Sequence, residues 1–257
     1  MSWLQNLLGG SKARVSGEPP SGNGASSFHL WWELGRGRPL QEVSAILEIV
    51  EPPRVDRLYF WAMQVSFADP DGGGAHIGIQ HHPRYPASGA VNWGGYAPQP
   101  EGGLLQGSPS PLPSAPNDPN TRDFAWSAHR PYRLGIGRSA EPGPEGFVAW
   151  RGSVEDLTTG EVTVVRDLYS RGTYLRGPVV WTECFARCDH PTTAVRWSGL
   201  QVVDDVDEPS VVTAVSVNYQ THANGGCDNT NSSVDGDGWL QRANTSRTNP
   251  TGTRLTP

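Results

Sequence analysis

Glu183 is the residue whose surroundings most strongly indicate chemistry. In the segment VVWTECFAR, the alternation of an extended strand places its carboxylate on the same face as Trp181 and Phe185. A carboxylate among aromatic side chains is costly unless it is paired or solvated. Desolvation raises the pKa of such a group toward the range in which it serves as a general acid or base. The structural alternative is an ion pair with Arg187 or Arg196.

A glycosidase would need a second carboxylate about 5–9.5 Å from the first. Glu155 and Asp156 are the candidates, and nothing in the sequence determines their distance from Glu183.

Amide, imidazole and indole groups gather around a predicted hairpin and form a candidate ligand-binding face. In HIGIQHH, alternation separates Ile77 and Ile79 from the polar residues on the opposite face. A jelly-roll sandwich commonly binds sugars in this way, with aromatic rings stacked on the pyranose and amides bonded to its hydroxyls. The alternative is that the tryptophans fill the core. The predicted ligand-binding residues are Gln64, His76, Gln80, His82, Asn92 and Trp93, with Trp126, Trp150 and Trp197 as further stacking candidates.

Cys184, Cys188 and His190, with the distant Cys227, contain the donor types that zinc prefers. In an extended chain, however, four residues separate two sulfurs by about 13 Å, which is too far to share one ion. We therefore expect no metal site here, but buried free cysteine or a Cys188–Cys227 bridge.

The segment GGCDNTNSSVDGDG, residues 225–238, is rich in the oxygen ligands that calcium prefers. It lacks the spacing of an EF-hand, and asparagine and aspartate are also ordinary turn residues. Calcium is thus a candidate cofactor and otherwise none is expected. No nucleotide-binding glycine pattern and no nucleophilic-serine motif is present.

Composition excludes several classes of function. The 257 residues include 31 glycines and 23 prolines without a collagen period, ten tryptophans, and a net charge of −6. Lys12 is the single lysine and the net charge is negative, so the chain lacks the basic surface of a nucleic-acid-binding protein. No apolar run reaches the roughly 18 residues of a membrane span.

Residues 1–26 read as a polar, disordered tail. The segment Met1–Leu8 has neither a basic start nor an apolar core followed by a cleavage site, so it does not resemble a secretory signal. Cytoplasmic residence is the corresponding expectation.

Short apolar strands separated by turn residues predict an all-β, two-sheet antiparallel sandwich or jelly roll over residues 27–220. The remainder, 221–257, is expected to pack on the same domain as loops and one short strand at Trp239–Arg242. The proline-rich stretch Pro98–Asn120 predicts a long surface loop that could cover a groove. Strand order does not follow from such patterns. The expected strands are 27–34, 42–50, 57–67, 76–82, 123–128, 132–138, 147–157, 161–168, 179–187, 195–203 and 211–220.

Three segments resemble an uncharacterised bacterial family of unknown function. They are YFWAMQ followed by AHIGIQ, WRGSVED with Thr159-Gly160, and WTECF. Met63 departs from the family pattern, in which a polar residue is usual. The resemblance spans roughly residues 59–220 and implies a concanavalin-like β-sandwich, often found near carbohydrate-related modules, without an established activity.

Two classes of function follow, and the sequence does not decide whether the protein is an enzyme. The first is a carbohydrate-binding or carbohydrate-active sandwich whose partner is a glycan. The second is a non-catalytic structural or protein-interaction module with all tryptophans in the core. If it is an enzyme, Glu183 is the expected acid or base, and Gln80 and His76 position the substrate.

Overall fold

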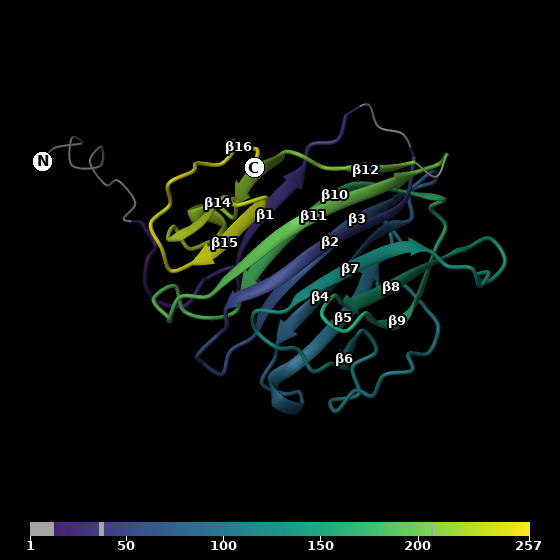
Figure 1. Ribbon diagram of the computed structural model, residues 1–257. Coiled ribbons are helices and arrows are strands. Elements are labelled where there is room, and N and C mark those ends of the chain that lie inside the picture. Colours follow the sequence, from purple (N-terminus) through teal and green to yellow (C-terminus); the bar gives the residue numbers. More distant parts are fainter. Residues whose placement is uncertain (1–12, 36–38, 207) are drawn as a thin grey trace, which may run out of the picture.

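The computed structural model describes residues 13–35, 39–206 and 208–257, and these residues form strands and loops with two single 3₁₀ turns (Figure 1). The expected all-β sandwich is confirmed: two antiparallel sheets pack face to face. In the described residues no helix is long and apolar enough to cross a membrane. A single bridge between Leu40 and Leu175 joins the two sheets at one corner.

The first sheet, called the β3 sheet, has the order β16-β13-β1-β10-β3-β4-β5-β6. Its strands are β1 (Ser26–Trp32), β3 (Tyr59–Ala68), β4 (Gly73–His81), β5 (Gly89–Tyr96), β6 (Thr121–Asp123), β10 (Tyr174–Cys184), β13 (Val215–Tyr219) and β16 (Arg254–Leu255).

The second sheet, called the β2 sheet, has the order β14-β15-β11-β2-β7-β8-β9, with β12 beside β11. Its strands are β2 (Leu40–Glu51), β7 (Pro131–Arg138), β8 (Val148–Asp156), β9 (Glu161–Ser170), β11 (Ala194–Asp204), β12 (Pro209–Val211), β14 (Thr230–Asp235) and β15 (Gly238–Ala243).

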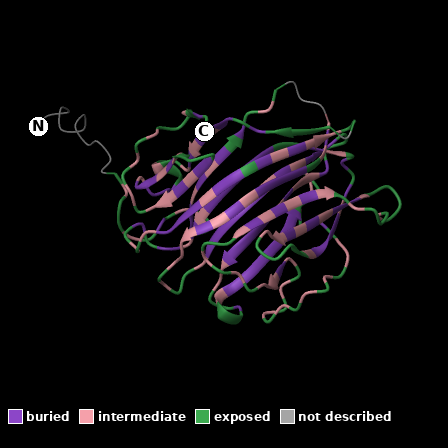
Figure 2. Ribbon diagram, in the orientation of Figure 1, coloured by how far each residue is buried: buried purple, intermediate pink, exposed green. Residues whose placement is uncertain are grey.

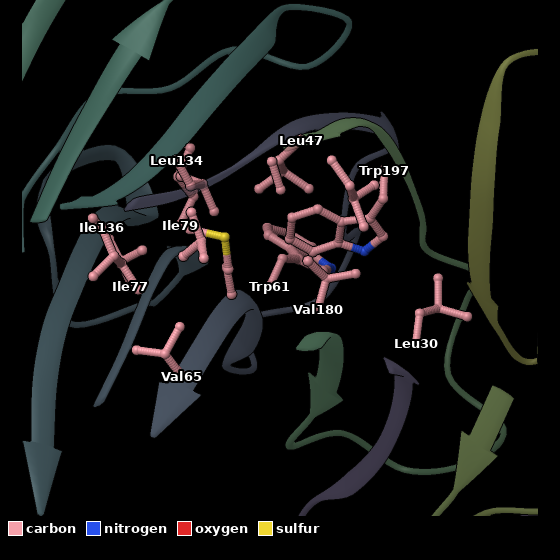
Figure 3. Close-up of a cluster of buried hydrophobic side chains, with 14 of the residues drawn as sticks. Leu30, Leu47, Trp61, Val65, Ile77, Ile79, Leu134, Ile136, Val180 and Trp197 are labelled. Atoms are coloured by element: carbon pink, nitrogen blue, oxygen red, sulfur yellow. The ribbon is translucent and has the colours of Figure 1, made fainter. Parts of the chain in front are cut away.

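The core lies between the sheets, where alternate residues of both inner faces meet (Figures 2 and 3). Trp61 of β3 and Val180 of β10 point toward Leu47 of β2 and Trp197 of β11 (Figure 3). Burying each such side chain stabilises the fold by about 1.5–3 kcal/mol. The alternation expected in β3 is confirmed, because Trp61 and Met63 enter this core while Phe60 belongs to a separate cluster on the other face.

The hairpin expected around the turn at residues 69–72 is the β3–β4 pair. Other expectations differ in extent. The strand expected at 123–128 is the three-residue β6, because the chain leaves the edge of β5 after Phe124, whose N–H donates to Gly89 at 3.3 Å. The C-terminal segment contains three strands, β14, β15 and β16, instead of one. In β14 the buried residues are the polar Thr230 and Ser232, so the strand shows no alternation of apolar and polar residues in the sequence.

The part of the expected tail at residues 1–12 lies outside the described residues. Residues 14–25, called the strap, form no strand but run along the body of the protein. The backbone N–H of Arg14 donates to Asp228 at 2.5 Å, and that of Cys188 donates to the carbonyl of Gly17 at 2.8 Å. The strap therefore has its own hydrogen bonds to the sandwich.

The loop between β5 and β6 runs along the side of the sandwich. Leu105 N–H donates to Gly95 of β5 at 2.9 Å, and Ser108 N–H donates to Asp167 of β9 at 2.9 Å. The loop thus connects the edges of both sheets. Its backbone hydrogen bonds are made to these edges and do not hold it over Glu183 as a cover.

Candidate active site

Glu183, Phe60 and Gln80 lie side by side on the outer face of the β3 sheet, the face turned away from the core. Glu183 of β10 is in register with Phe60 of β3, which is in register with Gln80 of β4. Neighbouring strands are about 4.8 Å apart, so the α-carbons of Glu183 and Gln80 are separated by roughly 10 Å. Phe60 therefore stands between Glu183 and Gln80 in this row.

Aromatic rings surround this row. Trp181 lies edge-on to Phe60, with 4.9 Å between ring centroids, and edge-on to His76 at 5.7 Å. His29 of β1 is 6.4 Å from Trp181. Trp181 is only 7% exposed although it points away from the core. The outer face therefore has an apolar, aromatic surface of its own beside Glu183.

Burial raises the pKa of Glu183 above its usual range, and a hydrogen bond from Asn23 partly opposes that shift. The amide nitrogen of Asn23 donates to the Oε1 atom of Glu183 at 2.8 Å. The raised pKa lies closer to neutral pH, which suits a group that acts as a general acid or base.

The ion pair considered for Glu183 is wrong. Arg187 pairs with Asp189 at 3.0 Å, and Arg196 pairs with Asp235 at 3.3 Å and also with Asp237. Both guanidinium groups are engaged by nearer carboxylates. Glu183 is consequently held by a neutral amide.

Gln80 and Asn92 bring buried amide oxygens to the same outer face. Asn92 of β5 is in register with Gly78, and its Nδ2 donates to Thr121 at 2.9 Å. Its Oδ1 atom and the Oε1 atom of Gln80 have no hydrogen-bond partner among the described residues. Buried polar atoms of this kind normally find a partner, so they mark where a ligand or water would bond.

His29 and His76 are neutral at physiological pH, because burial lowers the pKa of each to about 4. Neutral imidazoles can donate one hydrogen bond and accept another. Both lie beside Trp181, so they add polar groups without charge to the face that carries Glu183.

Four of the six predicted ligand-binding residues share the outer face. Gln64 is in register with His76, and Gln80 and Asn92 lie on neighbouring rows. His82 does not join them, because it follows the end of β4 and packs against Tyr85 at 4.8 Å.

The prediction that Trp93 contributes a stacking surface is wrong, because its side chain is 0% exposed and belongs to the core. Its indole packs where a Cβ on Gly152 of β8 would come within 2.6 Å of the ring. Trp150 and Trp197 are also fully buried. Trp126 instead donates its indole N–H to the backbone carbonyl of Gln80 at 2.8 Å.

The expected second carboxylates lie on the other sheet. Glu155 of β8 pairs with Arg133 at 2.5 Å, and Asp156 pairs with Arg130 at 3.1 Å. Neither lies on the outer face of the β3 sheet with Glu183. A pair of acidic groups around one glycosidic bond is therefore not formed by these residues.

The calcium interpretation is not supported. No group of three or more His, Cys, Asp or Glu side chains in the described parts of the chain could hold a metal ion. Asp228 accepts from Arg14 and lies 2.9 Å from His222, while Asp235 and Asp237 bind Arg196. These carboxylates thus stabilise the turns around β14.

Cys188 and Cys227 form a disulfide, and Cys184 is a buried free thiol. This agrees with the expected alternatives to a zinc site. Burial raises the pKa of Cys184 to about 12, so its thiol stays protonated and unreactive.

Two residues near Glu183, His29 and Asn23, are absent from the set of site residues predicted from the sequence. The alternation in SFHLWW puts His29 and Trp31 on one face of β1, and this signal was available. Asn23 had no such signal, because 160 residues separate it from Glu183.

No family model matches the chain, and no curated protein matches it. The resemblance to the uncharacterised bacterial family is therefore unconfirmed, whereas the β-sandwich is present.

Several solved structures share part of the fold. A scytalido-glutamic peptidase bound to a peptide-based transition-state analogue is 14% identical, with a TM-score of 0.42, over 84% of this chain and 97% of that chain. SCP-B, of the eqolisin family of peptidases, bound to the tripeptide Ala-Ile-His, is 12% identical with a TM-score of 0.40 over 89% and 98%. A mutant alginate lyase, Aly36B, bound to an alginate trisaccharide, is 11% identical with a TM-score of 0.26 over 67% and 78%. At these values the comparisons assign no residue and no reaction.

Proposed function

We propose that the protein is a hydrolase that cleaves an amide bond of an extended chain on the outer face of the β3 sheet. Glu183 would act as the general base and then as the general acid, and Gln80 would stabilise the negative charge that develops on the substrate carbonyl oxygen. The observation that carries the proposal is the row Glu183–Phe60–Gln80, in which a carboxylate of raised pKa and an amide lie on neighbouring strands on either side of one aromatic residue.

In the proposed reaction the ionised Glu183 accepts a proton from water as the water oxygen attacks the carbonyl carbon. The amide N–H of Gln80 donates to the oxygen that gains negative charge, the role that an amide plays in an oxyanion hole. Glu183 then returns the proton to the leaving nitrogen as the carbon–nitrogen bond breaks. The products are an acid and an amine, and no second carboxylate is needed.

Glycoside hydrolysis fits less well, because it requires two carboxyl groups about 5–9.5 Å apart. In the row of Glu183, the next carboxylate is Asp123, which pairs with Ala90 beyond Gln80. Four strand spacings place it roughly 19 Å from Glu183. The proposal therefore departs from the carbohydrate-active expectation.

The test is a peptide-library digestion from pH 3 to 8, read by mass spectrometry. The wild-type protein should cleave peptides, and Glu183→Gln should lose activity by at least about 100-fold while still binding substrate. Gln80→Ala should lower kcat by about 100-fold. Glu161→Gln, an exposed change on β9 of the other sheet, is the matched control and should leave cleavage unchanged.

Full activity of Glu183→Gln would contradict the proposal, as would a wild-type protein that cleaves no member of the library.

Glycan binding without catalysis is the second candidate, favoured by two exposed rings on the outer face. Trp31 is 43% exposed and Tyr96 is 60% exposed. Such rings can stack on the apolar side of a sugar. Iodide quenching of tryptophan fluorescence measures this directly: a bound glycan should protect Trp31, and Trp31→Ala should abolish the protection. Absence of protection across a glycan panel would contradict it.

A further inference from the structure

The strap ends at the candidate active site, and its position there is determined by several contacts. Its beginning is held by Asp228, which receives the backbone N–H of Arg14 and donates its own N–H to the Arg14 carbonyl at 2.7 Å. Cys188 N–H donates to Gly17, and Gly225 approaches so closely that a Cβ there would come within 2.3 Å of Ser21 N. The strap is thus tied to both half-cystine segments before it reaches Glu183.

The orientation of the Asn23 amide follows from its partners. Its Oδ1 atom accepts the backbone N–H of Ala25 at 3.2 Å, and the Ser21 hydroxyl, which donates to the Ala25 carbonyl at 2.5 Å, lies 3.0 Å from the same Oδ1. Because the oxygen receives a backbone N–H, the NH₂ group must point the other way, toward Oε1 of Glu183. Asn23 consequently presents a donor, not an acceptor, to the carboxylate.

The groups around Glu183 leave this donor without a charged competitor. Ser27 of β1 and Phe60 of β3 are its neighbours in register, and Trp181 precedes it on its own face. His29 and Gln80 are polar groups of the same face, Gln220 accepts the backbone N–H of Ser27 at 2.9 Å, and Cys184 belongs to the core. Among the described residues, Asn23 is the hydrogen-bond partner of the Glu183 carboxylate.

We propose that Asn23 is the positioning residue of the active site: it holds Oε1 of Glu183 so that the other carboxylate oxygen exchanges the proton with water and substrate. This inference rests on the proposed function of Glu183. The same hydrogen bond stabilises the ionised carboxylate, so it also adjusts the pH at which Glu183 becomes a base.

Asn23→Asp is the decisive variant. Aspartate retains Oδ1, which can still accept the backbone N–H of Ala25, so a purely structural role of the turn is preserved. Its second oxygen replaces the donor and faces Glu183 with like charge, which disfavours the ionised form. Asn23→Ala removes the donor without adding charge.

The measurement is a ¹³C NMR titration of the Glu183 side-chain carboxyl, assigned by its loss in Glu183→Gln. The midpoint should move upward by up to about one pH unit in Asn23→Ala and further in Asn23→Asp. The rising limb of the peptide-cleavage pH profile should move with it, with about tenfold lower kcat at pH 7 and an unchanged KM. Asn117→Asp, the same charge change in the exposed loop beside β6, should move neither.

An unmoved midpoint in Asn23→Asp, or one that moves equally in Asn117→Asp, overturns the proposal whether or not the wild-type protein cleaves peptides. If the midpoint moves in Asn23→Asp but the wild-type protein has no hydrolytic activity, the proposed function is overturned, and Asn23 merely holds the carboxylate.

Discussion

Glu183 carries an energetic cost in the folded protein that its substitution should reveal. Its pKa is raised by burial, so the folded state binds the proton of Glu183 more tightly than the unfolded state does. The stability that this group contributes is therefore greatest below its unfolded pKa and is lost as the pH rises through its folded pKa. Where Glu183 is ionised, a partly buried carboxylate without a charged partner weakens the fold.

We accordingly predict that Glu183→Gln is at least as stable as the wild-type protein at pH 7. The difference in unfolding free energy should shrink as the pH falls and Glu183 becomes protonated, because the two side chains then carry equal charge. Urea denaturation at pH 7, 5 and 4 measures it. A loss of about 3 kcal/mol at pH 7 would instead identify a broken buried ion pair, which the pairing of Arg187 and Arg196 with other carboxylates excludes.

At the residue scale, the sequence predicted part of the site for a sound reason. Alternation along β4 placed His76 and Gln80 on one face, and alternation along β10 identified Glu183 as an unusual carboxylate. The same rule separates Asn92 from Trp93, which are consecutive in β5 and must face opposite sides. Grouping them as one site ignored that signal. Asn23 could not be predicted, because tertiary folding alone brings it to Glu183.

At the element scale, the close pairing of β3 and β4 depends on Gly78, which is in register with Ala62. A Cβ at Gly78 would lie 2.1 Å from the carbonyl oxygen of Trp61 and 2.7 Å from the Cβ of Ala62. These neighbours are backbone or a rigid methyl group, so the strands would have to separate.

Gly78→Ala should therefore destabilise the protein by about 1–3 kcal/mol, the usual cost of overpacking. Because Gln80 lies two residues along the same strand, hydrolytic activity should fall with it. Thermal unfolding by circular dichroism gives the stability. Gly135→Ala on β7 is the control, since its new Cβ would meet nothing nearer than the Ser153 hydroxyl at 3.1 Å. Equal stability of the two variants would show that β3 and β4 tolerate separation.

The elements themselves were more predictable than their order. Apolar alternation located most strands of both sheets, because each buries one face. The order did not follow, since neighbours such as β1 and β10 are distant in sequence and pair through register. β14 was missed because its buried positions are threonine and serine, which look like turn residues in isolation.

At the scale of the whole molecule, the Cys188–Cys227 disulfide joins the loop after β10 to the segment before β14 across 39 residues. Disulfides are typical of proteins that fold in oxidising compartments. Closing a loop of this length is expected to stabilise the fold by about 3–4 kcal/mol.

Cys188→Ala together with Cys227→Ala should thus lower the unfolding midpoint clearly, and the wild-type protein in a strong reductant should match this double variant. Both should also raise the titration midpoint of Glu183, because the strap is tied to the two half-cystine segments. Cys184→Ala tests the buried thiol separately and should leave the effect of reductant unchanged. A double variant as stable as the wild-type protein would contradict this role.

The loop that joins β5 to β6 has a further consequence for how copies of this protein behave in solution. A strand at the border of a sheet exposes backbone groups that can recruit a strand from another molecule. Here the N–H of Leu105 donates to the carbonyl of Gly95 in β5. On β9, Ser108 donates its N–H to Asp167, and the carbonyl of Gln106 accepts the N–H of Tyr169. Prolines, which offer no N–H, continue this shield on its exposed side. The loop thereby covers backbone groups at the edges of both sheets, where a strand of another molecule could otherwise pair.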